Sequence, residues 1–267
     1  MRTMHRIALD LALLATLCGM LAACSVSGSS EREDLEAVRT AYMNGFYIEA
    51  KEGYESYLQR YPKGESRLEA WERLLEIALN VKGDLDRSIV LLEAMILEYG
   101  EKSSSAWTLM FQLAELYEQR GDRTKALDTW QKCLELGRDD TQRKVETLLR
   151  MAAVHRVLHN YDRALTLLQK CEELSPDGPT RARCQYEEAQ TYSFMQSWGQ
   201  AKEVLEVIMA DGVADKDTQA LAVFLLADVY EQEMDYDRAR ELFLSIANTY
   251  PNPKVIQIRL EKMGKGH

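Results

Sequence analysis

Two histidines are the first residues in this chain whose spacing could support chemistry. His155 and His159 lie four residues apart, so on a helix both imidazoles would share one face, a spacing that zinc sites use. A zinc site needs three or four ligands, and no third candidate lies beside this pair. We therefore expect a packing or surface role for both histidines, and we expect neither a bound metal nor another cofactor.

Three of the five cysteines, Cys133, Cys171 and Cys184, lie in the body of the chain. Cys171 and Cys184 flank the proline-containing turn at 176–179, so the helices that carry them should be neighbours, and in an exported protein the pair could form a disulfide. The alternative is that all three are modest core residues. We favour this alternative, because disulfide formation depends on a geometry that the sequence does not supply.

The sequence contains none of the common catalytic motifs: no Gly-x4-Gly-Lys-Ser/Thr phosphate loop, no His-Glu-x-x-His and no Gly-x-Ser-x-Gly. Its carboxylates recur at spacings that suit ion pairs on helix faces, where no shifted pKa is expected. Acidic residues outnumber basic ones by 43 to 33, for a formal net charge of -10. Nucleic acid requires a basic face, so it is an unsuitable partner. We expect a protein that is not an enzyme.

A fixed repeat organises the residues that remain. Small residues recur every 38 residues, with one interval of 37, at Ala50, Ser88, Ala126, Ala164, Ala201 and Ala239. We call these the reference positions of repeats 1 to 6. Twelve residues before each of them stand Val38, Glu76, Ala114, Ala152, Ala189 and Ala227. Nine residues before each of them stand Ala41, Leu79, Tyr117, His155, Tyr192 and Tyr230. A period between 20 and 50 residues is typical of a solenoid.

This order of small, aromatic and small residues, closed by a proline or glycine, resembles the tetratricopeptide repeat over residues 31–252. The resemblance implies an all-α superhelical solenoid of about six antiparallel helix pairs in one elongated domain. Repeat 2 fits worst, with Glu76 and Ser88 where alanine is usual. The common unit has 34 residues. The four extra residues here should form another helical turn or a longer connection between successive pairs.

In tetratricopeptide repeats the first helix of each pair lines a concave surface that binds partners. Carried over by position, that surface would contain Tyr42, Arg73, Phe111, Glu115, Arg156, Tyr186, Phe194, Phe224 and Asp228. Phe111, Tyr186 and Phe224 share one slot of the repeat and would suit an extended or helical peptide. The alternative is that some of these aromatic residues belong to the core. The Lys and Asn of a chaperone-tail clamp are absent from the slots held by Phe111 and Glu115, so carboxylate-tail binding of that type is not expected.

Residues 1–23 are predicted to be a lipoprotein signal peptide that directs export. A positive start and a short apolar run precede Leu21-Ala22-Ala23-Cys24, which resembles a bacterial lipobox. The resemblance implies cleavage before Cys24 and acylation of that residue, palmitate included. The alternative is an ordinary secretory signal or an unmodified cysteine. Ser25, by resemblance to lipoprotein sorting in enteric bacteria, favours the periplasmic face of the outer membrane. Residues 24–30 would then be the lipidated cysteine and a flexible tether, and 253–267 a capping helix and tail.

Several periplasmic lipoproteins share this layout. The chain resembles the BamD-like (YfiO) group of the outer-membrane β-barrel assembly machine in its lipobox, its units of about 38 residues and endings such as 57–62. That group has five repeats, whereas six are counted here. Two alternatives stay open: a pilotin-like lipoprotein for a secretin of type IV pili, and an adaptor for peptidoglycan enzymes. Each implies a scaffold whose partners are other envelope proteins.

Overall fold

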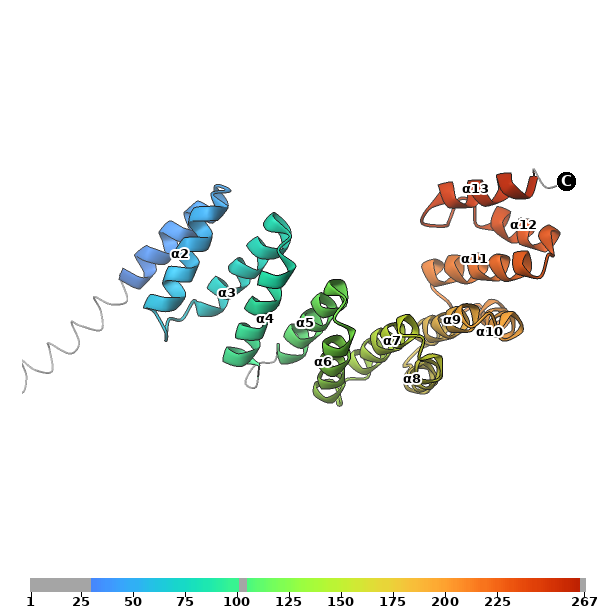
Figure 1. The fold of residues 1–267 in the computed structure, drawn as a ribbon, viewed down its shortest axis with the longest axis horizontal. Helices are drawn as coiled ribbons and strands as arrows, with labels where there is room; N and C mark the ends of the chain where they lie inside the picture. The colour runs from blue at the N-terminus through green and yellow to red at the C-terminus, as the bar shows by residue number, and fades with distance from the viewer. Residues whose placement is uncertain (1–29, 101–104, 265–267) are drawn as a thin grey trace, which may run out of the picture. The chain divides into compact units, whose positions relative to one another are not determined.

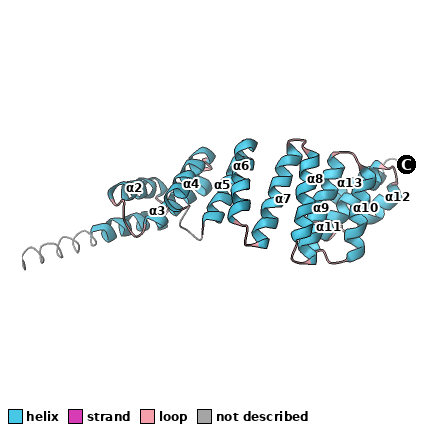
Figure 2. Cartoon of the chain, turned by 90° about the horizontal axis from the view of Figure 1, so that it is seen from below, coloured by secondary structure: helices cyan, strands magenta, loops and turns pink. Residues whose placement is uncertain are grey.

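The computed structural model describes residues 30–100 and 105–264. The predicted signal peptide, Cys24 and most of the tether lie outside these ranges. The described residues form helices joined by short turns and contain no strand (Figures 1 and 2). The predicted all-α solenoid class is confirmed. The helices divide into two compact units, one within residues 1–102 and one within 103–267, where the sequence analysis expected one continuous domain.

Among the residues that the structure describes, the first unit contains two helix pairs and the second contains four pairs and a final helix. The first unit consists of a helix over residues 30–43, α2 (Tyr47–Arg60), α3 (Arg67–Glu76), the π-helix η1 (Ile77–Lys82) and α4 (Leu85–Tyr99). The second consists of α5 (Ala106–Arg120), α6 (Arg123–Leu136), α7 (Thr141–Val157), α8 (Tyr161–Leu174), α9 (Gly178–Phe194), α10 (Trp198–Asp211), α11 (Lys216–Gln232), α12 (Tyr236–Ser245) and α13 (Pro253–Gly264). The first helices α7, α9 and α11 each have 17 residues, so some of the residues by which this repeat exceeds 34 lie in its first helix.

Each reference position is the fourth residue of a second helix and is completely buried. The side chains in these positions are Ala50, Ser88, Ala126, Ala164, Ala201 and Ala239, all 0% exposed. A methyl or hydroxymethyl group lets the two backbones of a pair approach closely, where a larger side chain would hold them apart. The period of the small residues therefore records the positions of closest helix contact.

The turn inside each pair has one backbone design. The residue five before the reference position has a positive φ, whether it is glycine, as at Gly121 (84°), or not, as at His159 (58°) and Met234 (62°). The next residue is the N-cap of the second helix, and the side chains of Asp122 and Asp235 in this position accept a hydrogen bond from the backbone amide three residues later. A residue with positive φ ends the first helix, and the N-cap after it begins the second. Together they reverse the direction of the chain, so that the two helices run antiparallel.

Repeat 2 contains one extra residue in its first helix, which corrects its register. In repeat 6 the amide of Asp235 donates to the carbonyl of Tyr230, five residues back, and repeats 1, 3, 4 and 5 have the same spacing. In repeat 2 the amide of Asp84 reaches six residues back, to Ala78. The π-helix η1 accommodates the added residue. The slots assigned above to Glu76 and Leu79 therefore belong to the residues before them, Leu75 and Ala78.

Apolar side chains fill the spaces between neighbouring helices of the second unit. Leu148 and Leu168 belong to one buried cluster between α7, α8 and α9. Leu205, Phe243 and Ile256 belong to a larger cluster that continues through α10, α11 and α12 to α13. The final helix thus covers the apolar side of the last pair, as a solenoid end requires.

Enlarging one reference residue should disrupt the stack locally. Ala126→Trp forces an indole into the contact between α5 and α6, and we expect a loss of about 1–3 kcal/mol or more in the free energy of unfolding, measured by urea denaturation. Hydrogen exchange should rise first in α5, α6 and α7, since each pair contacts its neighbours. The exposed Asp128→Trp on the same helix is the control. Equal loosening of all described helices would contradict this expectation.

Candidate functional site

The predicted concave-face residues of the first unit contact one another. The guanidinium of Arg73 lies over the Tyr42 ring, 4.9 Å from its centroid. Arg73 also donates to Glu76 at 2.7 Å. The Tyr42 ring packs edge-on against Tyr47 and Tyr54, at 5.6 Å and 6.4 Å between centroids. Tyr42 and Arg73 therefore form a half-buried contact between the first helices of repeats 1 and 2.

In the second unit, Phe111 and Glu115 are covered by an arginine of the next first helix. Phe111 packs edge-on against Trp130 at 4.6 Å between centroids. The Arg150 guanidinium lies 5.7 Å from the Phe111 centroid and donates to Glu115 Oε1 at 2.5 Å. The aromatic ring is thus partly in the core and partly beneath a cation, which joins α5 to α7.

Arg156 joins α7 to α9 in the same way. Its Nη2 lies 2.8 Å from Glu187 Oε2, and its guanidinium lies 5.6 Å from the centroid of the Phe194 ring. Phe194 itself is 58% exposed. Tyr186 packs against the apolar cluster of the second unit, and burial raises the pKa of its hydroxyl to about 12. Of these predicted contact residues, Phe194 is the aromatic one that solvent reaches best.

The last pair repeats this contact with the final helix. The Phe224 ring stacks on Tyr250 at 4.7 Å between centroids, and the Arg259 guanidinium of α13 lies 5.8 Å from the Phe224 centroid. Arg259 forms ion pairs with Asp228 and Glu231. The predicted partner-binding charges of the second unit thus take part in bonds between repeats.

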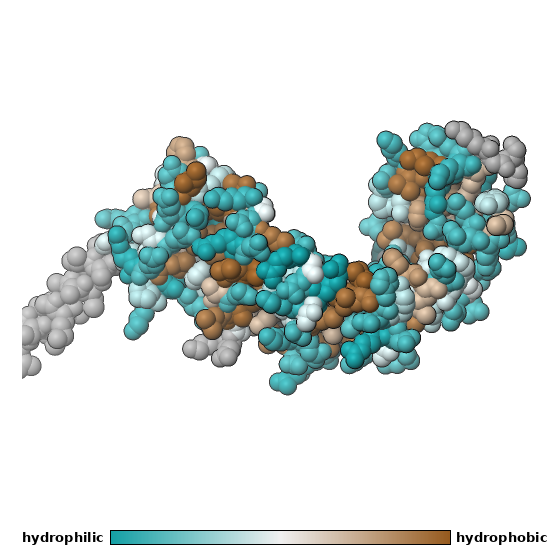
Figure 3. All heavy atoms as spheres, viewed as in Figure 1, coloured by the Kyte–Doolittle hydropathy of each residue, from teal (hydrophilic) through white to brown (hydrophobic). Residues whose placement is uncertain are grey.

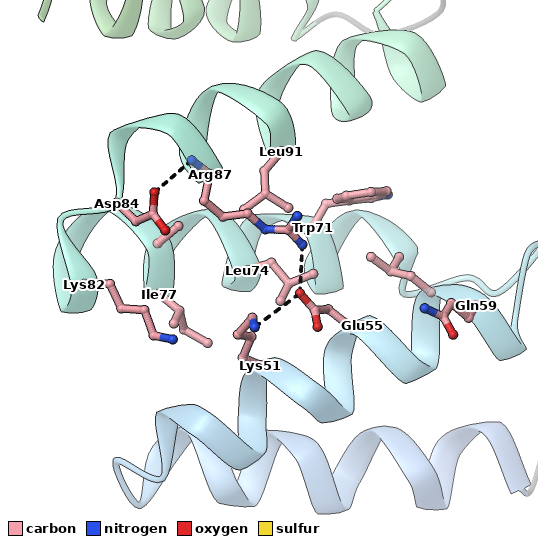
Figure 4. Close-up of a pocket in the computed structure, with 12 residues that line it drawn as sticks. Lys51, Glu55, Gln59, Trp71, Leu74, Ile77, Lys82, Asp84, Arg87 and Leu91 are labelled. Atoms are coloured by element: carbon pink, nitrogen blue, oxygen red, sulfur yellow. Dashed lines mark hydrogen bonds and ion pairs between the residues drawn. The ribbon is translucent and has the colours of Figure 1, made fainter. Parts of the chain in front are cut away.

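A cavity of about 580 Å³ lies in the first unit, between α2, α3, η1 and α4 (Figure 4). Its apolar lining includes Leu74, Ile77 and Leu91. This volume falls within the range of small-ligand sites, about 300–1,000 Å³, which are typically apolar with a few placed polar groups. The cavity was not predicted from the sequence. The one signal for it was the poor fit of repeat 2 to the repeat pattern.

Charged side chains from two second helices edge this cavity. Lys51 Nζ lies 3.8 Å from Glu55 Oε1, and Arg87 Nη2 of α4 donates to the same oxygen at 2.8 Å. Figure 4 shows these three side chains directed toward one another across the opening. Figure 3, which displays one face of the molecule, shows hydrophilic residues over most of the surface and smaller apolar patches between them.

The structure joins Cys171 and Cys184 by a disulfide, with 5.9 Å between their Cα atoms. This departs from the unpaired state favoured above for these two cysteines. Cys133 is free and buried, and burial raises the pKa of its thiol to about 12. The bond links the end of α8 to α9, so it closes the connection between repeats 4 and 5.

The two histidines have different surroundings. His155 is buried, which lowers its imidazole pKa, while the exposed His159 has its Nδ1 2.7 Å from the Tyr161 hydroxyl. Within the described ranges, no group of three or more His, Cys, Asp or Glu side chains could hold a metal ion. None of the described helices combines the length and apolar character needed to cross a bilayer.

The expectation that no carboxylate has a shifted pKa is wrong at several positions: arginine and tyrosine partners lower the pKa of some carboxyls, such as Glu98, and burial raises that of Glu172. Glu172 on α8 is desolvated by burial and shares a hydrogen bond with Glu188 on α9. Both effects raise the pKa of Glu172 above its ordinary value. The pair lies beside the disulfide at the same connection between repeats.

Family models place tetratricopeptide repeats at residues 109–144 and 221–253. No curated protein sequence matches the chain. Among solved structures, the C-terminal part of a repeat-containing protein from Cytophaga hutchinsonii is 14% identical, with a TM-score of 0.55 over 80% of this chain and 78% of that one. BtubC from P. vanneervenii is 16% identical, with a TM-score of 0.54 over 84% and 92%. A kinesin light chain-like repeat protein from Podosopora anserina is 16% identical, with a TM-score of 0.53 over 76% and 100%. These likenesses show the fold.

Reduction of the disulfide should destabilise the second unit. The two cysteines are 13 residues apart in sequence, and a loop of that size corresponds to about 2–4 kcal/mol of unfolding free energy. We expect a lower urea midpoint for the wild-type chain in dithiothreitol than without it. The double variant Cys171→Ser, Cys184→Ser should have the same urea midpoint as the reduced wild type, and dithiothreitol should not change it. Equal midpoints for the oxidised and reduced wild type would contradict the prediction.

The Glu172 carboxyl should make stability depend on pH. Because its pKa is raised in the folded state, its favourable contribution is complete below the unfolded pKa and is lost as the pH rises through the folded one. Glu172→Gln stays neutral, so the variant should gain stability relative to wild type between pH 4 and pH 8. Urea denaturation at both pH values measures this, with the exposed Glu173→Gln as control. A pH-independent difference would rule the effect out.

Proposed function

We propose that this tetratricopeptide-repeat protein is a lipid-anchored scaffold on the periplasmic face of the bacterial outer membrane. Tetratricopeptide repeats bind protein partners, and a protein–protein interaction scaffold is the function that the fold supports. Ion pairs between successive first helices, such as Arg150–Glu115 and Arg156–Glu187, hold the repeats against one another and support the rigid framework that a scaffold needs. The partners we propose are other envelope proteins, as in the assembly of outer-membrane β-barrels.

The observation that carries the cellular address is the tetrapeptide Leu21-Ala22-Ala23-Cys24 after a positive start and an apolar run. The Cys171–Cys184 disulfide is independent support for export, since disulfides persist in oxidising compartments and are rare in the cytosol. An acyl chain on Cys24 would provide the anchor. The net charge of -10 would not draw the chain to anionic lipid, so the lipid must hold it at the membrane.

The anchor is tested at its attachment residue. Cys24→Ala should abolish incorporation of labelled palmitate and move the protein out of the outer-membrane fraction, because the thiol that receives the lipid is gone. Metabolic labelling and membrane fractionation measure both effects. Cys18→Ala, in the apolar run before it, is the matched control and should behave as wild type. If Cys24→Ala is labelled and fractionates as the wild type does, the proposed lipid anchor is contradicted.

The partner class is identified by affinity purification from detergent-solubilised envelope. Enrichment of a β-barrel insertase supports the outer-membrane assembly role. Enrichment of a secretin would support the pilotin alternative, and enrichment of cell-wall synthases or hydrolases the adaptor alternative. Retention of no envelope protein would contradict the scaffold function.

A further inference from the structure

The surroundings of Tyr230 in repeat 6 show what this fold places around a phenol ring. Lys202 Nζ and the Arg238 guanidinium lie 4.9 Å and 5.4 Å from the ring centroid. The tyrosine hydroxyl donates to Glu206 Oε1 at 3.4 Å. Lys202 and Glu206 belong to α10 and Arg238 to α12. Two cations therefore face the ring and one carboxylate receives the hydroxyl, from second helices of successive repeats.

The cavity of the first unit has the same three residue types in the same repeat positions. Lys51 and Glu55 stand one and five residues after the reference position of repeat 1, as the lysine and glutamate beside Tyr230 do in repeat 5. Arg87 immediately precedes the reference position of repeat 2, as the arginine beside Tyr230 does in repeat 6. All three line the cavity (Figure 4).

The ring itself is missing from repeat 2. The residue whose carbonyl closes the turn is Tyr230 in repeat 6 and Ala78 in repeat 2, as the acceptors of Asp235 and Asp84 show. Ala78 lines the cavity with a methyl group where the other repeat has a phenol. Because no ring separates them, Arg87 reaches Glu55 directly. The cavity therefore lies where a tyrosine side chain stands in repeat 6, because the one-residue insertion in η1 places an alanine in that slot of repeat 2.

We propose that this cavity binds a tyrosine side chain of a partner protein, with the ring between Lys51 and Arg87 and the hydroxyl donating to Glu55. The inference rests on the proposed scaffold function and names the feature of the partner that it recognises. Aromatic side chains bury about 150–250 Å² each and dominate the energetics of interfaces, so one such anchor can define a docking point. The apolar floor at Leu74 and Ile77 suits the ring, and Glu55 distinguishes a phenol from a benzene ring.

The direct test uses N-acetyl-L-tyrosinamide and the full chain in ligand-observed NMR. We expect saturable binding with a dissociation constant on the order of 1 mM, typical of a fragment of this size. N-acetyl-L-phenylalaninamide should bind several-fold more weakly, and N-acetyl-L-leucinamide should not bind detectably. Failure of the tyrosine probe to bind, or equal binding of all three, would overturn the proposal.

Ala78→Tyr should fill the cavity from within. The variant should lose binding of the tyrosine probe and unfold at a higher urea concentration, because it restores the ring that the surrounding side chains accommodate elsewhere. Val90→Tyr places the same ring at an exposed position of α4 that does not line the cavity, and should bind as wild type. Retained binding in a folded Ala78→Tyr chain would refute the assignment.

Glu55→Gln provides a second variant that keeps the volume of the cavity. It should reduce the preference for the tyrosine probe over the phenylalanine probe, whereas an unchanged preference would contradict the role given to Glu55. The failures of the two proposals are distinguishable. If the wild-type chain retains an envelope partner but no tyrosine probe binds, the cavity assignment fails and the scaffold stands. If the probe binds and no envelope protein is retained, the scaffold fails and the cavity assignment stands.

Discussion

The close contact of two helices at one small side chain is the interaction on which each pair depends. Ala126 and Ala164 are completely buried, and each lies one turn into a second helix, where its backbone meets the first helix of the pair. A hairpin made this way hides one face and leaves another apolar face open. The next pair covers that face, which explains why Leu168 and Leu205 belong to clusters that continue into the following repeat. Apolar packing therefore continues from one pair to the next within the second unit.

Charge has a second role in this stack. Arg150, Arg156 and Arg259 each pair with an acidic residue of a neighbouring first helix, and each also lies over an aromatic ring. Such partly exposed pairs contribute modestly to stability, but together with the rings they fix the orientation of one first helix against the next. Residues that the sequence predicts on a binding surface thus hold neighbouring helices together. The exposed ring of Phe194 remains available on this face.

Repeat 2 differs from the others by one residue, and the difference has a spatial consequence. The π-helix moves a small residue, Ala78, into the slot where Tyr117 and Tyr230 stand in other repeats. A π-bulge in a helix often marks a functional position. Here it leaves an opening edged by Lys51, Glu55 and Arg87, whose counterparts in repeats 5 and 6 surround the ring of Tyr230. The least regular of the described repeats therefore has a cavity where another repeat has a tyrosine ring.

The sequence alone determined the helical pairs, their period and the contact residue of each second helix, because small side chains must recur wherever two backbones touch. It also identified Cys171 and Cys184 as the candidate pair, but the distance between their backbones was set by how α8 meets α9. The burial that raises the pKa of Glu172 had the same origin. The register of repeat 2 could not be read from spacing, since a π-helix adds a residue without changing the period of the reference positions. Whether an aromatic or charged residue faces solvent, the core or a neighbouring repeat depends on contacts between helices far apart in sequence, and only the tertiary structure supplies these.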